Sequence, residues 1–179
     1  MSLQRNAVPA RLFAVAIRLA SWLQGLSGKL TPPPFRVVQM GAAFWQSRAL
    51  FVAARLDVAT ALGQGSLAAG EIAARTGANA DALCRLLRLL AASGVFREVA
   101  PRVFANNEAS EWLREDKAGN VRAMVLMHNS ETMSRPWYER LEEGVRTGMV
   151  PFELAHGREF YDYQAAHPDF GALFARAMD

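Results

Sequence analysis

Few residues of this 179-residue chain have the types and spacing that catalysis or metal binding requires. The carboxylate pairs Glu115-Asp116 and Glu142-Glu143 are adjacent in sequence, so the two acids of each pair point to different faces of a helix. Three histidines are scattered without metal-ligand spacing, namely His128, His156 and His167. We therefore expect solvated acids, no catalytic residue and no metal site.

Phosphate-binding loops and reactive thiols are also missing from the sequence. The glycines that come nearest to a dinucleotide loop, Gly63-Gln64-Gly65, precede a predicted helix-turn-helix and do not follow a strand, so they read as an ordinary loop. The one cysteine, Cys84, lies on a leucine-rich segment, where it reads as a small core residue. The sequence predicts no cofactor-binding residue, and we do not expect this chain alone to be active.

Basic residues between positions 67 and 105 suggest a different function, which is DNA binding. Phosphate contacts need such residues, and the stretch supplies Arg75, Arg85, Arg88, Arg97 and Arg102. Glu71, Asp81 and Glu98 oppose them, and the expected recognition helix has an outer face rich in alanine and leucine. A DNA-binding regulator therefore remains an alternative, supported only by these few basic residues.

The same stretch predicts a winged helix-turn-helix with a small β-hairpin. A helix over about residues 68–76 would stop at Gly77, and a second would begin behind Asn79 and stop at Gly94. Apolar strands at 95–96 and 103–104 would flank a turn containing Pro101. One buried stripe follows helical spacing and consists of Leu83, Leu86, Leu87 and Leu90.

Two expected helices before this stretch carry more apolar surface than a small chain can bury. Residues 8–26 and 37–62 each read as a helix, separated by the proline-rich break at 31–34. The second is apolar nearly all round. We therefore expect a homodimer through the N-terminal helices; a purely intramolecular bundle is the alternative.

Charge is distributed unevenly along the chain. The net charge is +3, but no acidic residue precedes Asp57, and seven basic residues do. The N-terminal apolar run is interrupted by Arg11 and Arg18, which makes it too short to span a bilayer. We expect a cytoplasmic protein without a membrane partner.

The C-terminal third reads as short helices, over residues 107–114, 121–127, 135–146, 159–166 and 170–178. The last of them is apolar and ends the chain, which suggests that something continues beyond it.

From residue 40 to residue 178 the order of segments resembles the N-terminal part of the S-adenosylmethionine-dependent O-methyltransferases of the plant caffeate and bacterial polyketide or phenazine type. The helix-turn-helix segment EIAARTGANADALCRLLRLLAASGVF is shared by many families. The motifs RTG-x-x-PF, HG-x-x-F and F-x-x-AM, in this order, are more specific.

The resemblance implies a mainly α fold, a helical dimerisation domain containing a winged helix that does not bind DNA. It implies a basic arm and linker over 1–36, a dimerisation helix plus winged helix over 37–112, and an acceptor-lid segment over 113–179. The catalytic domain, which holds S-adenosylmethionine and the catalytic histidine, would then be absent from this chain, which would bind no cofactor itself.

The resemblance also implies residues that line the pocket of a small aromatic acceptor. By position these are Met127 and His128, and by the F-x-x-AM motif Phe174 and Met178; Phe160 and Phe170 are weaker candidates. Methionine and phenylalanine suit a flat aromatic substrate. The alternatives stay open: Phe174 and Met178 as core residues, His128 as a surface histidine.

Three functions therefore compete. The first is the dimerisation and acceptor-lid domain of an O-methyltransferase. The second is a winged-helix transcriptional regulator. The third is a stand-alone dimeric module that binds a small aromatic ligand, which would require a closed pocket.

Overall fold

The computed structural model describes residues 31–179, so the helix expected over 8–26 lies outside the described residues. Contacts divide the chain into two units, and the boundary lies between Phe44 and Trp45. The fold is mainly helical with one small antiparallel sheet, as predicted. No helix in the described range is long and apolar enough to cross a membrane.

The first described helix, α2 (Pro33–Arg55), begins earlier than predicted and ends earlier too. Pro33 and Pro34 occupy its first turn, where a missing backbone N–H has no helical partner to lose. Asp57 then adopts the left-handed conformation, with φ of 54°, and separates α2 from α3 (Val58–Leu62). The prediction of one helix over 37–62 is therefore wrong, because a short polar residue tolerates this turn.

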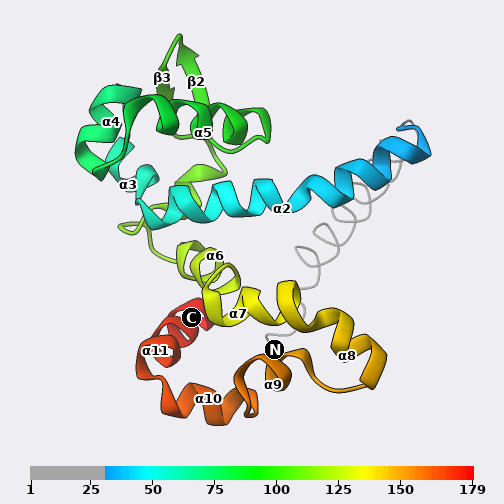
Figure 1. The fold of residues 1–179 in the computed structure, drawn as a ribbon. Coiled ribbons are helices and arrows are strands. Elements are labelled where there is room, and N and C mark those ends of the chain that lie inside the picture. Colours follow the sequence, from blue (N-terminus) through cyan, green and yellow to red (C-terminus); the bar gives the residue numbers. More distant parts are fainter. Residues whose placement is uncertain (1–30) are drawn as a thin grey trace, which may run out of the picture. The chain divides into compact units, whose positions relative to one another are not determined.

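The predicted winged helix-turn-helix is present (Figure 1). It comprises β1 (Ser66–Ala68), α4 (Ala69–Thr76), α5 (Ala80–Ala92), β2 (Arg97–Ala100) and β3 (Val103–Ala105). The strand order is β1-β3-β2, all antiparallel, with Leu67 and Glu98 both opposite Phe104. The strand β1 was not predicted, because the sequence predicts a loop at 63–65 and a helix that starts at about residue 68. The first hairpin strand starts two residues later than predicted, behind Phe96, which has a φ of 71°.

The main core lies around α5. The predicted stripe is buried at Leu83, Leu87 and Leu90, while Leu86 is partly buried. Side chains from α3, α4, β3 and the residue before β2 complete this core; they include Val58, Ile72, Phe104 and Phe96. Asn79 caps α5 by accepting from the backbone N–H groups of Asp81 and Ala82.

Short helices follow the wing: η1 (Ser110–Leu113, a 3-10 helix), α6 (Arg122–His128), α7 (Glu131–Arg135), η2 (Pro136–Arg140, a π-helix) and α8 (Leu141–Thr147). The last three are α9 (Pro151–His156), α10 (Phe160–Ala166) and α11 (Pro168–Met178). Pro136 lacks an N–H, and the helical bonding changes there to the π pattern. Helix α9 lies between the helices expected over 135–146 and 159–166, where the sequence predicts none. In Figure 1, α11 lies against α6, and their contact is extensive.

Candidate functional site

Aromatic side chains of α9, α10 and α11 form one cluster. Phe160 is central to it, with its ring centroid 5.2 Å from Phe152, 5.9 Å from Phe170 and 5.3 Å from Phe174. These pairs meet edge to face, the arrangement that the ring quadrupoles favour. The cluster therefore fixes the three helices relative to one another.

Two histidines belong to the same cluster. His156 lies 4.5 Å from both Phe152 and Tyr163, and its Nε2 hydrogen-bonds the carbonyl oxygen of Thr132 at 2.9 Å. His167 stacks on Tyr163 at 3.7 Å, and its Nδ1 hydrogen-bonds the Tyr163 carbonyl. Since a carbonyl only accepts, each histidine donates from the named nitrogen. His156 thus ties α9 to α7.

The four residues expected to line an acceptor pocket occupy different environments. Met127 is buried on α6, with 3% of its surface exposed, whereas its neighbour His128 is exposed. Phe174 is half-buried in the aromatic cluster, and Met178, one turn later on α11, is 53% exposed. The structure places Phe174 and Met178 on one face, while Met127 and His128 face different sides of α6.

A small apolar pocket lies beside this cluster and was missed in the sequence. Its volume is about 280 Å³, and it lies among α7, η2, α9 and α10. The lining side chains are Met133, Pro136, Trp137, Val150, Pro151, Phe152 and Phe160. The RTG-x-x-PF motif contributes Val150, Pro151 and Phe152 to this lining, and it is the sequence signal that could have indicated the pocket.

The C-terminus of α6 is held by α2. Asn129 exchanges hydrogen bonds with the Ser47 hydroxyl, at 3.0 and 3.2 Å, and its carbonyl accepts from the Arg48 guanidinium at 2.8 Å. The Arg48 guanidinium also lies 4.6 Å from the centre of the Phe51 ring. These contacts fix the turn that follows Met127 and His128.

The arginines of the winged helix are largely occupied within the module. Arg88 binds both carboxylate oxygens of Glu98, and Arg102 binds Asp81 at 2.6 Å. The Arg88 hydrogen bonds hold the pKa of the Glu98 carboxyl below its usual range. The Arg102 guanidinium does the same to the pKa of Asp81.

Two more of the arginines donate to the backbone. Arg75 donates to the Ala61 carbonyl at 2.7 Å, and Arg97 donates to the Asn106 carbonyl at 3.5 Å. Ion pairs neutralise Arg88 and Arg102. The bonds to carbonyl oxygens leave Arg75 and Arg97 charged but use some of their N–H donors, so fewer donors remain for phosphates. This arrangement counts against DNA binding.

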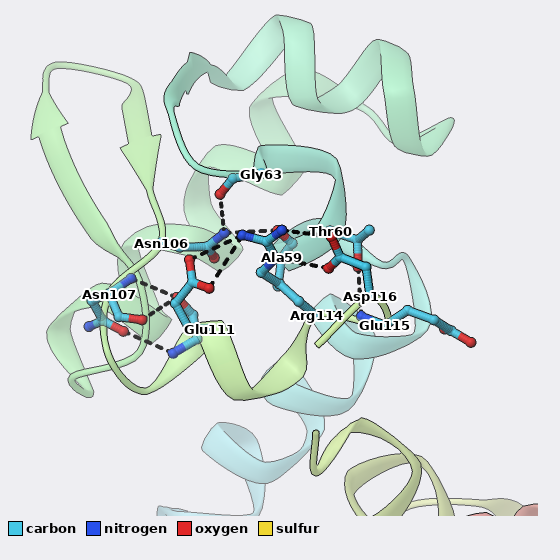
Figure 2. A network of polar contacts seen from close by, with 10 residues as sticks. Ala59, Thr60, Gly63, Asn106, Asn107, Glu111, Arg114, Glu115 and Asp116 are labelled. Carbon is cyan, nitrogen blue, oxygen red and sulfur yellow. Dashed lines mark hydrogen bonds and ion pairs between the residues drawn. The ribbon is translucent and has the colours of Figure 1, made fainter. Parts of the chain in front are cut away.

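A polar network closes the winged module behind the wing (Figure 2). The Asn106 amide donates to the carbonyls of Ala59 and Gly63, at 2.8 and 2.9 Å. Asn107 donates to Gly94 and Phe96 and accepts from the N–H groups of Ala109 and Ser110. These bonds connect the wing to α3 and to the loops on both sides.

The same network continues through η1. The nearly buried Arg114 side chain pairs with Asp116 at 2.7 Å and with Glu111 at 3.3 Å. The Asp116 hydrogen bond raises the pKa of Arg114 above its usual value. Thr60 donates to Asp57 and accepts from the Glu115 N–H. Among the described residues, the Oδ1 of Asn106 is buried without a hydrogen-bond partner. The charged side chains of the network are paired within the chain, which suits a structural role.

A metal ion would need several ligand side chains close together. Over the described range, no group of three or more histidine, cysteine, aspartate or glutamate side chains has a geometry that could hold one. Cys84 is buried in the core.

Comparison with known families agrees with these features. The sequence pattern of the O-methyltransferase dimerisation domain matches residues 38–116. This part of the chain is an O-methyltransferase dimerisation domain. The winged helix, the core around α5 and most of α2 fall within the matched range, so the expected family is confirmed.

Relatives extend the likeness beyond the dimerisation domain. A phenazine O-methyltransferase of Lysobacter antibioticus is 34% identical over 142 residues, which is 79% of this chain and 41% of the relative. The solved mitomycin 7-O-methyltransferase MmcR is 33% identical, with a TM-score of 0.73 over 92% of this chain and 45% of its own.

A further solved relative contains ligands. The O-methyltransferase NcsB1, 34% identical with a TM-score of 0.60, covers 74% of this chain and was solved with S-adenosylmethionine and 2-hydroxy-5-methyl naphthoic acid. This chain spans 41% of the length of that protein. The larger part of each relative therefore has no counterpart in these 179 residues.

Proposed function

We propose that this chain is the dimerisation and acceptor-lid part of a small-molecule O-methyltransferase. The parent reaction is methyl transfer from S-adenosylmethionine to a hydroxyl group of an aromatic or polyketide-like substrate. The match to the dimerisation domain supports the first role. The apolar face of α11 is the observation that supports the second.

The proposed acceptor wall consists of Phe174 and Met178, with His128 as a polar partner and Met127 beneath. Phe174 is held at its position by Phe160, whose ring lies 5.3 Å away. Met178 remains more than half exposed, so a flat ring can lie against it. Met127 is buried, so a substrate would meet it only after neighbouring side chains moved.

Binding to the purified chain tests this wall. Phenazine-1-carboxylate is a suitable probe, because relatives of this chain act on phenazines and the probe joins a planar ring to a carboxylate. Calorimetry should show weak binding that decreases about threefold to tenfold in Phe174→Ala and in Met178→Ala. Trp112→Ala, which removes an exposed ring from η1, is the control and should leave binding unchanged.

The cofactor gives a second measurement on the same sample. S-adenosylmethionine should show no heat of binding, since the proposal assigns its site to a part of the parent enzyme outside these residues. Tight S-adenosylmethionine binding by the 179-residue chain would contradict this assignment.

The proposal includes a homodimer formed through the N-terminal helices. The first half of α2 exposes large apolar side chains, the most exposed being Met40 at 81% and Val37 at 72%. Phe35 and Val38 are also exposed, on the other side of the helix. Large apolar side chains exposed in this way are typical of an interface between subunits.

Sedimentation velocity tests the dimer. The wild-type chain should sediment as a dimer, and Met40→Asp should shift it to the monomer, because a charge would be desolvated in the interface. Val99→Asp, an equivalent change at an exposed valine of the wing, is the matched control and should remain dimeric. A monomeric wild-type chain would exclude the homodimer.

A further inference from the structure

The pocket beside the aromatic cluster has an almost wholly apolar lining. Of the described residues that line it, only Trp137 has a polar side-chain atom, its indole N–H. Phe152, Phe160 and Trp137 contribute rings, and Met133 contributes a polarisable thioether. A ligand for this lining needs apolar surface and few hydrogen-bonding groups.

The size of the pocket restricts the ligand further. An apolar cavity of roughly 150 Å³ accepts one benzene ring, and this pocket measures about 280 Å³. It therefore has room for about two fused rings. A helix or a strand of a partner protein is too wide to enter.

The walls of the pocket are held in place before any ligand binds. Pro136 and Pro151 each stand in the first turn of a helix, where their fixed φ limits movement. Pro151 also packs on Gly144 of α8, where an added Cβ would lie 2.8 Å from the proline Cγ. Phe152 is fixed by Phe160 and Tyr163. A preformed pocket binds with little loss of conformational entropy.

The position of Phe160 separates this pocket from the proposed acceptor wall. Its ring lines the pocket and also contacts Phe174. Met178 is not among the described residues that line the pocket. The two surfaces thus lie near Phe160 but use different side chains.

From lining, volume and rigidity, we propose that the pocket formed by α7, η2, α9 and α10 binds a neutral, planar ring system of about two fused aromatic rings. The ring stacks among Trp137, Phe152 and Phe160. Its binding does not depend on Met178 or on S-adenosylmethionine.

The probe for this pocket is 2-naphthol, titrated into the full 179-residue chain by calorimetry. Decahydro-2-naphthol, which has the same carbon skeleton but is not planar, should bind about tenfold more weakly or not at all. Val150→Phe should weaken 2-naphthol binding about tenfold or more by filling the pocket. Val150 is half exposed, so the substitution leaves the fold intact, and circular dichroism checks this.

Two controls separate this proposal from the acceptor wall. Val145→Phe introduces the same side chain on α8, at an exposed position that is not among the described residues lining the pocket, and should not change 2-naphthol binding. Met178→Ala should also leave 2-naphthol binding unchanged while it weakens phenazine-1-carboxylate binding. Trp137→Ala removes one wall of the pocket and should weaken the binding of 2-naphthol. This variant is a second test besides Val150→Phe.

Several results would overturn the proposal. They are no 2-naphthol binding up to its solubility limit, equal binding by Val150→Phe, or a loss in Met178→Ala as large as that in Val150→Phe. If the wild-type chain does not bind 2-naphthol and the Val150→Phe substitution dissociates the dimer, the pocket instead receives a side chain from another subunit.

Discussion

The winged module buries most of its large apolar side chains, whereas the C-terminal helices leave many of theirs partly exposed. In the module, Leu87 and Phe104 are fully buried and Phe96 is 2% exposed. In the C-terminal helices, Trp137 is 62% exposed and Met178 is 53% exposed. Large apolar side chains that remain partly exposed are available to other molecules.

Polar groups show the same difference. Ion pairs of the module connect separate elements, such as α5 with β2 through Arg88 and Glu98. Pairs on η2 and α8, such as Glu142 with Arg146, lie one turn apart on an exposed helical surface and stabilise little. The comparison indicates that the winged module is a rigid spacer. Surfaces that bind other molecules are then expected in the segments before and after it.

The largest expected effect comes from removing a core side chain in each region. Leu87→Ala should lower the free energy of unfolding by about 3 kcal/mol, because the fully buried leucine leaves a cavity. Phe174→Ala should cost only about 1 kcal/mol, since its side chain is half-buried. Urea denaturation of both variants measures the difference. Equal losses would mean that the two regions are packed alike.

A glycine in α8 gives a smaller effect that is specific to the C-terminal helices. Gly144→Ala should destabilise by about 1–3 kcal/mol, because the new Cβ would lie 2.9 Å from the Met149 carbonyl oxygen. Gly70→Ala, in α4, meets open space and should be neutral or slightly stabilising through helix propensity. Thermal unfolding of the two variants in parallel distinguishes them; a tolerated Gly144→Ala would show that the α8–α9 turn is adaptable.

The smallest expected effect is the loss, at low pH, of the stability that the ion pair between Arg88 and Glu98 gives to the wing. The pKa of Glu98 is lowered by Arg88, so its contribution to stability is complete above the ordinary pKa of 4.5 and disappears as pH falls through the lowered value. Glu98→Gln should therefore be slightly less stable than wild type at pH 7 and equal to it in strong acid. The difference should shrink in high salt. Urea titrations at several pH values measure it, and a difference independent of pH would exclude the ion pair as its source.

Much of the fold was predictable from local signals. Leucine spacing and the Asn79 cap identify α5, and glycines mark where α4 and α8 end. The break at Asp57 and the strand β1 were not predictable. Asp57 sits inside a helical pattern, and β1 is a strand only because Phe104 pairs with Leu67 across the sheet.

The site was less predictable than the fold. Motif positions pointed to Phe174 and Met178, and the structure shows them on one face of α11 with different exposure. The pocket lined by Val150 and Trp137 was missed, because it is formed by residues from four helices. No single-helix pattern contains that information.

The sequence by itself determined the helix-turn-helix, its apolar core and the family, because spacing, caps and motifs are local properties of the chain. Only the tertiary structure decided which charges are neutralised and which apolar side chains stay exposed. Arg102 could have met a phosphate, yet it meets Asp81, 21 residues away in sequence. Exposure and pairing depend on how helices pack, and helix packing is a property of the whole set of contacts.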